Sequence, residues 1–299
     1  MAYKSVQVQS VIYENEKKNL FRTIECLANA VRFAREEGSE LGQVKLLYGD
    51  ASPEPVLSQE DLGRLKTDYA SRLEIDYRVF GFNSGSAHGH NILAEGCNAD
   101  YLLIMNPDVR VSPQTLREMM APFAEEKVGM VEARQTPVEH PKDYNKKTKE
   151  TDWATTACAM IRNDLFRALQ GFDYETFFLY CDDVDFSWRV RLQGFQVIYQ
   201  PLAPVFHAKR LDSLGGWQPS HAEIYYSKEA SLMMAYKWSR SDLVQQLLCA
   251  YRKGSDMEKE IAEKFLKRSQ EGTLPKPLDP QHKVSKFVGW NYAKHRFVI

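Results

Sequence analysis

Carboxylates stand at two places in this sequence where they could bind a cation or accept a proton. The first is Asn106-Pro107-Asp108, which directly follows the apolar run YLLIM at residues 101–105. A carboxylate at the carboxyl end of a buried strand lies where parallel α/β sheets bind their ligands. It can hold Mg²⁺ or Mn²⁺ together with phosphate oxygens and water. The structural alternative is an Asx turn that closes the strand.

The second place is the start of a predicted helix over residues 182–192, where Asp182, Asp183 and Asp185 stand close together. The helix dipole favours acids there, and Asp182 as N-cap with Asp185 in the first turn would account for two of them. Asp183 follows the apolar run 177–180 and is a candidate general base. A helix N-terminus lowers the pKa of a carboxyl group whereas apolar surroundings raise it, and the sequence leaves that balance open.

The loop from Asn83 to Asn91 (NSGSAHGHN) is rich in small residues and leads into a predicted helix. Backbone N–H groups in such a loop could bind a phosphate. The glycine spacing matches neither GxGxxG nor a P-loop. The alternative interpretation is a turn whose glycines allow close packing.

His207 follows a predicted strand over residues 195–199. It could be a metal ligand, since a neutral imidazole suits Mn²⁺ better than Mg²⁺, or a hydrogen-bonded structural residue. Lys209 and Arg210 beside it could meet a diphosphate.

Strands and helices alternate along the first 134 residues and must position these groups. Strands are predicted at residues 6–13, 44–48, 73–80, 101–105 and 128–133, and helices at 20–35, 58–69, up to 93, and 112–124. This alternation predicts an α/β fold with a mostly parallel sheet and helices on its faces. Ser112 as N-cap and Pro113 in the first helical position predict where the last of these helices begins.

The rest of the chain is less regular. Residues 135–150 are polar and lysine-rich, which favours a solvated surface loop, with a flap over a site as the alternative. Helices are predicted at residues 163–169, 182–192 and 223–238. Irregular structure is expected to follow them.

Composition limits the classes of function. Of 299 residues, 43% are hydrophobic and 26% charged, as in globular proteins, and the length allows two domains or one large domain. A net charge of −1 argues against a generic nucleic-acid binder. The five cysteines include no CxxC pair, which predicts reduced thiols. The N-terminus has no signal-peptide core and the chain no 18-residue apolar run, so we expect a cytoplasmic protein.

Together, and in this order, these segments resemble the inverting glycosyltransferases of family 2, in particular the bacterial rhamnosyltransferase-like branch. The resemblance covers residues 6–210. It rests on Asp50; Asn83, Gly85, Gly89 and Asn91; Asn106, Pro107, Asp108 and Val109; Gly171, Phe172 and Asp173; Phe177 and Phe178; Asp182, Asp183, Val184 and Asp185; Arg191 and Gly194; and Pro204, Val205, Phe206 and His207. Each motif is weak alone, whereas their joint order and spacing are specific.

The resemblance implies a GT-A fold and a nucleotide-diphosphate-sugar donor. Asp108 would bind the Mg²⁺ or Mn²⁺ that bridges the donor diphosphate, with His207 as a further ligand. Asp183 would deprotonate the acceptor hydroxyl in a single inverting displacement. The other residues with implied roles are Tyr13, Glu14, Asn15 and Asp50 at the nucleobase and ribose, Asn83, Asn91, Asn106, Lys209 and Arg210 in the rest of the donor site, and Trp153 and Asp182 at the acceptor.

We therefore expect a metal-dependent inverting glycosyltransferase that adds a sugar to a bacterial surface glycan such as an O-antigen. By resemblance, dTDP-rhamnose is the first donor to consider and a lipid-linked glycan the acceptor. One alternative is a non-catalytic module that binds nucleotide sugars or glycans. The other is a sugar-phosphate nucleotidyltransferase, which is disfavoured because no glycine-rich basic loop follows the first strand.

The expected domains are residues 1–215 and a helical extension over 216–299. The last 19 residues contain four basic side chains, no acid and four aromatic rings: Lys283, Lys286, Lys294 and Arg296, with Phe287, Trp290, Tyr292 and Phe297. Such a segment suits the surface of an anionic membrane, here the inner face of the cell membrane. The alternative is a solvated tail or a strap that packs on the domain.

Overall fold

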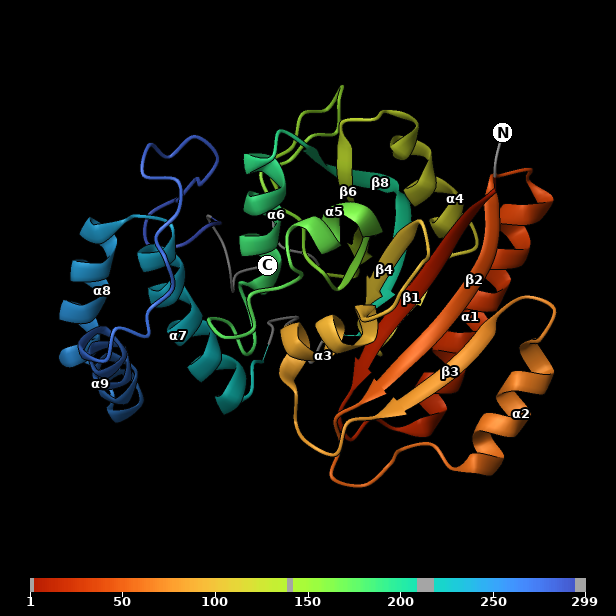
Figure 1. Cartoon of the computed structure of the whole chain (residues 1–299), viewed down its shortest axis with the longest axis horizontal. Coiled ribbons are helices and arrows are strands. Elements are labelled where there is room, and N and C mark those ends of the chain that lie inside the picture. Colours follow the sequence, from red (N-terminus) through yellow and green to blue (C-terminus); the bar gives the residue numbers. More distant parts are fainter. Residues whose placement is uncertain (1–2, 139–141, 209–217, 294–299) are drawn as a thin grey trace.

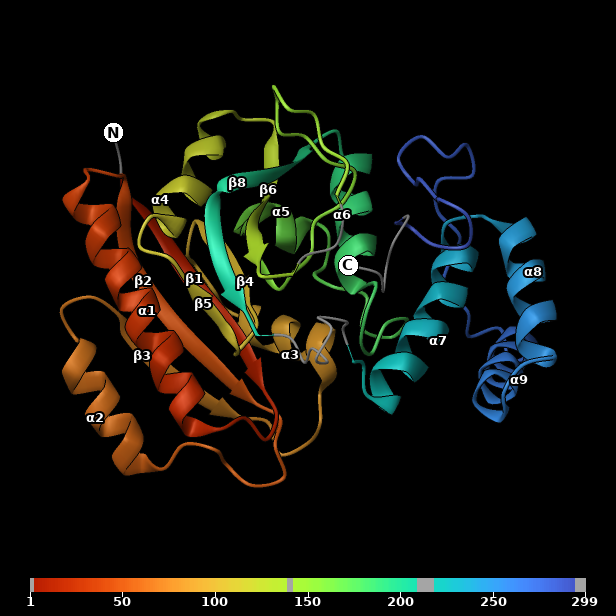
Figure 2. The same ribbon diagram turned by 180° about the vertical axis from the view of Figure 1, so that it is seen from behind.

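The computed structural model describes residues 3–138, 142–208 and 218–293. Within these ranges, eight strands form one sheet in the order β3-β2-β1-β4-β7-β6-β8-β5, with helices on both faces (Figures 1 and 2). The strands are β1 (Lys4–Ile12), β2 (Leu41–Asp50), β3 (Glu74–Val79), β4 (Tyr101–Met105), β5 (Val109–Val111), β6 (Val128–Thr136), β7 (Cys158–Arg162) and β8 (Gln196–His207). The α/β architecture predicted from the sequence is confirmed.

The four strands β3, β2, β1 and β4 pair in parallel. Their connections run through helices, as parallel pairing requires: α1 (Lys17–Glu36), α2 (Gln59–Tyr69) and α3 (Gly85–Ala94). α1 and α2 cover the face seen in Figure 2, whereas α3 lies on the face seen in Figure 1. The carboxyl ends of these strands therefore meet at one edge of the sheet, where the predicted donor residues begin.

β4 is buried on both faces, as its continuous apolar sequence predicted. Leu103 and Met105 belong to the core beneath α1. Leu102 and Ile104 belong to a second core that includes residues of α3 and α6 (Asp182–Leu192). The strand is thus held rigidly from both sides, which fixes the position of Asn106-Pro107-Asp108 directly after it.

The other half of the sheet is mixed. β7 runs antiparallel between β4 and β6, and β5 pairs antiparallel with the end of β8. Four of the seven pairings within the described ranges are parallel, so the expected parallel order holds for the first half of the sheet and not for the second.

Several element boundaries differ from the sequence prediction, and two of these differences concern the segments around the site. Ser112 and Pro113 do not begin a helix, because the backbone N–H of Ser112 donates to Thr115 Oγ1 and closes a turn. Helix α4 (Thr115–Met120) follows and ends in the 3₁₀ turn η1 (Ala121–Ala124). β8 continues far beyond residue 199, so His207 is its last residue and does not lie in a loop after it.

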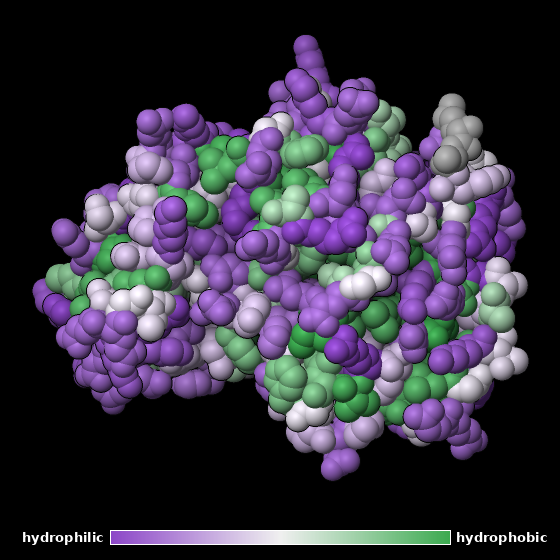
Figure 3. Space-filling view, viewed as in Figure 1, coloured by the Kyte–Doolittle hydropathy of each residue, from purple (hydrophilic) through white to green (hydrophobic). Residues whose placement is uncertain are grey.

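Within the described residues, the C-terminal region forms three helices: α7 (His221–Lys237), α8 (Ser241–Arg252) and α9 (Asp256–Gln270). The expectation of irregular structure after residue 238 was therefore wrong for α8 and α9. All three helices share a core with α6, where the Trp188 and Trp238 rings meet edge to face at 5.0 Å. Hydrophilic residues cover most of their outer surface (Figure 3). The domain boundary near residue 215 stays a prediction, since it lies outside the described residues.

The segment that follows α9, residues 271–293, packs in part against the rest of the protein. The Phe287 ring packs 5.3 Å from that of Trp188, and the Tyr292 ring lies 4.9 Å from that of Trp153. Trp290 is 49% exposed. Phe297, Lys294 and Arg296 lie outside the described residues. No helix within the described ranges is long and apolar enough to cross a membrane.

All five cysteines lie within the described ranges, and none of them is paired in a disulfide there.

Candidate active site

Asp108 and His207 are brought together by the pairing of β5 with β8. Val109, next to Asp108, lies opposite His207 in the antiparallel register. As a result, Asp108 Oδ1 is 3.4 Å from His207 Nε2. The two candidate metal ligands of the sequence therefore form one cluster at the carboxyl end of β4.

The orientation of the His207 ring is set from behind by Gln135 on β6. His207 Nδ1 lies 2.6 Å from Gln135 Oε1, and an amide oxygen can only accept, so Nδ1 carries the hydrogen. In the neutral ring this tautomer leaves the lone pair on Nε2, which faces Asp108, with Asn106 Nδ2 at 3.4 Å. A lone pair and a carboxylate that face each other favour a cation between them, and a second hydrogen bond of this kind is typical of metal-binding histidines.

This donor set fits a divalent cation that arrives with its substrate. The described residues contain no group of three or more His, Cys, Asp or Glu side chains arranged so that they could hold a metal ion. The chain thus offers Asp108 and His207, and phosphate oxygens and water would supply the remaining ligands of a six-coordinate ion. The 37% exposure of the Asp108 side chain leaves its carboxylate accessible to such a ligand.

Helix α6 begins as predicted at Asp182, but its N-cap is Cys181. Tyr180 and Cys181 both have left-handed backbone conformations, with φ of 69° and 62°. This turn directs Asp182 into the interior, so the prediction that Asp182 is the N-cap is wrong. Its side chain is buried, and Oδ2 has no hydrogen-bond partner among the described residues.

Burial, followed by the charge of Asp183, raises the pKa of Asp182 to about 8. Asp182 is thus mainly protonated at neutral pH, whereas the neighbouring Asp183 is only half-buried. Asp183 Oδ1 accepts a 2.8 Å hydrogen bond from the backbone N–H of Val184. Two adjacent acids in different environments suit different chemical roles.

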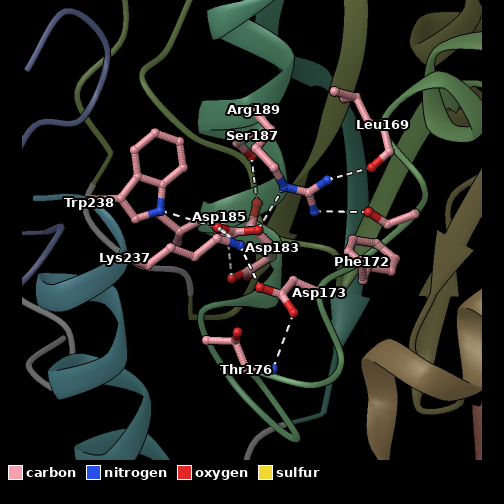
Figure 4. Close-up of polar contacts among 12 residues, drawn as sticks. Leu169, Phe172, Asp173, Thr176, Asp183, Asp185, Ser187, Arg189, Lys237 and Trp238 are labelled. Atoms are coloured by element: carbon pink, nitrogen blue, oxygen red, sulfur yellow. Dashed lines mark hydrogen bonds and ion pairs between the residues drawn. The ribbon is translucent and has the colours of Figure 1, made fainter. Parts of the chain in front are cut away.

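A short segment over residues 153–157 links the candidate metal ligands Asp108 and His207 to α6. The backbone N–H of Ala154 donates to Ser187 Oγ, whose hydroxyl also contacts the Asp183 carbonyl oxygen at 2.7 Å (Figure 4). The carbonyl oxygen of Ala157 accepts from the backbone N–H of Asn106 at 2.9 Å. Motifs that lie far apart in the sequence are therefore held by the same strip of backbone.

Gln135 belongs to the site although the sequence did not single it out. Its amide oxygen contacts His207 Nδ1, and its Nε2 lies 3.4 Å from Thr155 Oγ1. Gln135 therefore joins His207 to residues 153–157. Gln135 pairs with Val205 across the parallel β6–β8 ladder. Its only signal in the sequence is a polar residue at the end of an apolar strand.

Trp153, a predicted acceptor contact, is buried under the loop that follows β6. The Lys142 ammonium lies 3.9 Å from the centre of the Trp153 ring and pairs with Glu132 of β6. Direct stacking of an acceptor on this ring is therefore blocked in the structure. The buried Lys142 side chain also shows that residues 135–150 are more than a solvated loop, although residues 139–141 lie outside the described ranges.

Asp50 is completely buried at the end of β2. Its carboxylate accepts hydrogen bonds from the Tyr77 hydroxyl and from the backbone N–H groups of Ser52 and Val56, the latter two at 2.8 and 2.7 Å. Burial, together with Asp50, raises the pKa of Tyr77. These bonds order the loop after β2, so Asp50 supports this loop, and a direct contact with a nucleotide stays an untested prediction.

The residues after β1 are more accessible. Tyr13 is 45% exposed, and its backbone N–H donates to Asn15 Oδ1 at 2.9 Å. Glu14 has a left-handed backbone with φ of 52°, and its N–H donates to Ser52 Oγ. The ends of β1 and β2 are thus joined, and contacts of Tyr13, Glu14 and Asn15 with a nucleobase remain predictions.

Asn91 of α3 is joined to the loop before α6 by two hydrogen bonds of its side-chain amide. Its Nδ2 donates to the Phe172 carbonyl oxygen and its Oδ1 accepts from the Phe172 N–H, both at 2.8 Å. A side chain at Gly171 would collide with Asn91 Oδ1. These bonds give Asn91 a structural role that holds the loop before α6 against α3, and its contact with the donor stays a prediction.

The glycines of the 83–91 loop serve close packing. A Cβ on Gly85 would lie 2.6 Å from the Phe178 carbonyl oxygen, and one on Gly89 would lie 2.7 Å from Val11. The close-packing interpretation is thus confirmed at both positions. Asn83 is exposed, and its Oδ1 accepts from the Gly85 N–H at 3.1 Å. Lys209 and Arg210 lie outside the described residues.

Solved structures with the same architecture identify the fold. This chain is similar to GalNAc-T7 bound to UDP, GalNAc and Mn²⁺, with a TM-score of 0.64 and 14% identity over 92% of this chain and 55% of that one. It is also similar to the mannosyltransferase PcManGT from Pyrobaculum calidifontis in complex with GDP-Man and Mn²⁺, with a TM-score of 0.57 and 16% identity over 92% and 73%. This chain has the GT-A fold. At these identities, the likeness establishes the GT-A fold alone.

Two relatives share sequence with this GT-A chain. An N-acetylglucosaminyl-diphospho-decaprenol L-rhamnosyltransferase of Mycobacterium tuberculosis is 32% identical over 94 residues, which is 30% of each protein. The low-salt glycan biosynthesis hexosyltransferase Agl10 of Haloferax volcanii is 22% identical over 227 residues, or 67% of this chain and 65% of that protein. The chain therefore spans less than two thirds of the length of these curated relatives. No protein-family model matches the sequence.

Proposed function

We propose that this protein is a metal-dependent inverting glycosyltransferase that moves a sugar from a nucleotide diphosphate to a hydroxyl of a glycan. The observation that carries the proposal is the Asp108–His207 pair, with Nε2 and a carboxylate oxygen 3.4 Å apart, at the carboxyl end of β4 in a GT-A fold. Two relatives that are named as glycosyltransferases support it.

In this proposal, Asp108 and His207 hold Mg²⁺ or Mn²⁺ against the donor diphosphate. The ion would offset the negative charge that grows on the leaving diphosphate. Gln135 keeps His207 in the tautomer that presents Nε2, and Asn106 lies beside both ligands. The structures of GalNAc-T7 and PcManGT were solved with Mn²⁺, which supports a divalent ion here.

Asp183 is the proposed general base. It takes the proton of the acceptor hydroxyl while that oxygen bonds to the anomeric carbon, and the bond from this carbon to the diphosphate oxygen breaks with its electron pair. One displacement inverts the anomeric centre and needs no enzyme nucleophile. Asp182 lies beside Asp183 with a raised pKa and with Oδ2 unpartnered among the described residues, and its contact with the acceptor stays a prediction.

Rhamnose from dTDP-rhamnose and a lipid-linked acceptor are the first substrates to test, because the mycobacterial relative is named as an L-rhamnosyltransferase acting on a decaprenol-linked sugar. Hexose donors come next, because the haloarchaeal relative is named as a hexosyltransferase. A bacterial surface glycan is the pathway that we propose.

The experiment is a transfer assay with dTDP-rhamnose, UDP-sugars and GDP-mannose on polyprenyl-diphospho-N-acetylglucosamine, with Mn²⁺, Mg²⁺ or EDTA. We expect transfer with inversion, which NMR of the product can measure, and loss of activity in EDTA. Asp183→Asn should lower turnover about 10³-fold while nucleotide binding persists. Nucleotide binding without transfer or hydrolysis of any donor would instead indicate the non-catalytic module.

A further inference from the structure

Lys237, the last residue of α7, lies between two carboxylates in the interior. Its Nζ is 2.6 Å from Asp173 Oδ2 and 2.6 Å from Asp185 Oδ1, and its side chain is 6% exposed (Figure 4). Asp173 belongs to the loop before α6, and Asp185 to the first turn of α6. One ammonium of the C-terminal helices thus joins the two segments that flank Asp183 in the chain.

Arg189 and Trp238 complete the network around Asp185. Arg189 Nε donates to Asp185 Oδ2 at 2.8 Å, and Trp238 Nε1 donates to Oδ1 at 3.1 Å (Figure 4). The guanidinium of Arg189 also donates to the carbonyl oxygens of Leu169 and Gly171, each at 2.8 Å. Two cations and two carboxylates balance, so no buried charge in this group is left without a counter-charge.

The network holds the loop before α6 in a defined shape. Asp173 Oδ1 accepts from the Thr176 N–H at 3.1 Å, and its carbonyl oxygen accepts from the Phe177 N–H. Burial acts to raise the pKa of Asp173, but the charge and hydrogen bond of Lys237, together with the hydrogen bonds from Thr176, outweigh it and lower that pKa. Asp173 is therefore ionised, and its position depends on Lys237.

A buried ion pair of this kind is weak evidence for a stabilising role, because apolar residues of similar volume in its place often stabilise the folded state equally well. What apolar residues would not supply is the simultaneous fixing of two segments through directed hydrogen bonds. These segments are residues 171–177, which precede the proposed base, and the first turn of α6, which carries it.

We infer that Lys237 is a positioning residue for Asp183, by which the C-terminal helices hold the start of α6 in its productive geometry. The inference rests on the proposed function of Asp183 as general base. It assigns the C-terminal helices a part in the chemistry although none of their residues is placed at the donor.

The test compares Lys237→Met with Lys228→Met in the full chain. Lys228 is a matched control, because it lies on the same helix and its ion pair, 2.8 Å from Glu258, joins α7 to α9 away from the α6 loop. Lys237→Met should lower kcat about 10- to 100-fold and leave the donor KM within about twofold, since a small misplacement of a reacting group has such effects. Lys228→Met should keep both constants.

Two further variants separate positioning from folding. Lys237→Arg keeps a cation and should recover part of kcat. Asp173→Asn combined with Lys237→Met removes one orphaned carboxylate, so it should regain thermal stability while kcat stays low. The inference is overturned if Lys237→Met keeps kcat within about twofold, or if kcat, donor KM and melting temperature all change together as in a general loss of structure.

Hydrogen–deuterium exchange decides the structural coupling independently of activity. Peptides that cover residues 171–185 should exchange faster in Lys237→Met than in Lys228→Met or the unmodified chain. Equal exchange in the two variants would overturn the inference. If the unmodified chain transfers no sugar, the proposed function fails, while the exchange result still decides whether Lys237 holds this segment.

Discussion

At the scale of single residues, His207 illustrates how a role depends on what lies behind a side chain. From the sequence alone, His207 could be either a structural residue or a metal ligand. In the structure, the 2.6 Å contact of its Nδ1 with Gln135 orients Nε2 toward Asp108. Asp50 and Asn91 match the motif of the family that the chain resembles. In the structure, each also makes hydrogen bonds within the protein that order a neighbouring loop.

Gln135→Leu removes the acceptor behind His207 and should free the ring to change tautomer. We expect the metal concentration for half-maximal activity to rise about 10-fold or more. Gln135→Glu keeps an oxygen acceptor at this position and should stay close to the unmodified protein. A metal titration of the transfer activity measures both. Equal metal dependence in the two variants would show that this hydrogen bond does not orient His207.

Asp182 should make the protein less stable as pH rises. Its pKa is raised to about 8 in the folded state by burial and then by Asp183, whereas an unfolded aspartate titrates near about 4. Between these values the folded chain binds more protons than the unfolded one, so the contribution of Asp182 is full below about pH 4 and is lost by about pH 8.

Asp182→Asn removes this titration, so the free energy of unfolding of the variant relative to the unmodified protein should increase from about pH 5 to about pH 8. Urea unfolding at the two pH values measures the difference. The exposed Asp143→Asn serves as the control and should follow the unmodified protein. A parallel pH dependence in Asp182→Asn would rule out a raised pKa at this position.

At the scale of elements, the site is assembled by strand pairing and by close helix contacts. β5 is only three residues long, but its antiparallel ladder with β8 places Asp108 beside His207. α3 approaches β1 and the loop before α6 closely enough that Gly85 and Gly89 leave no room for a side chain. Short elements thus determine the site through their contacts rather than their length.

Gly85→Ala tests the close approach of α3 to the α6 loop, with Gly81→Ala as control. Both glycines have positive φ, 64° and 77°, but a Cβ at residue 81 meets no atom within 4 Å. Gly81→Ala should therefore cost about 1 kcal/mol of backbone strain. Gly85→Ala should cost about 1–3 kcal/mol more, because the new Cβ collides with the Phe178 carbonyl. Urea unfolding compares the two, and equal losses would contradict the contact.

At the scale of the whole molecule, the sheet and the C-terminal helices share α6. Its Phe186 belongs to the core that includes residues of α3, whereas Trp188 packs against Trp238 of the C-terminal region. The predicted basic-aromatic tail is only partly available for a surface, because Phe287 and Tyr292 pack inward. Trp290, 49% exposed, is the aromatic residue that the described part of this segment offers to a membrane.

Trp290→Ser tests the proposed contact with an anionic membrane. We expect binding to vesicles that contain anionic phospholipid to fall several-fold in a sedimentation assay, because an exposed interfacial ring is lost. The melting temperature should change little, since the ring makes one hydrogen bond, to Gln246. Phe287→Ser is the control that should lower the melting temperature. Unchanged vesicle binding in Trp290→Ser would remove the support for this contact.

The sequence by itself determined the local features of this protein. The bounds of β4 and α6 match the prediction from apolar runs and acidic residues, because helix and strand signals are contained within about ten neighbouring residues. The order of the motifs also pointed to the GT-A fold. Asp108, Asp182 and Asp183 were singled out in this way, since their chemistry is visible in the residue types.

Only the tertiary structure decided which of these groups contact one another and which make hydrogen bonds within the protein. The support of His207 by Gln135, the burial of Asp182 and the link from Lys237 to the α6 loop all join residues through packing or strand pairing. The register of β5 against β8 and the docking of α7 on α6 depend on the whole core. No local pattern encodes them, because a contact between distant segments is selected by the free energy of the complete fold.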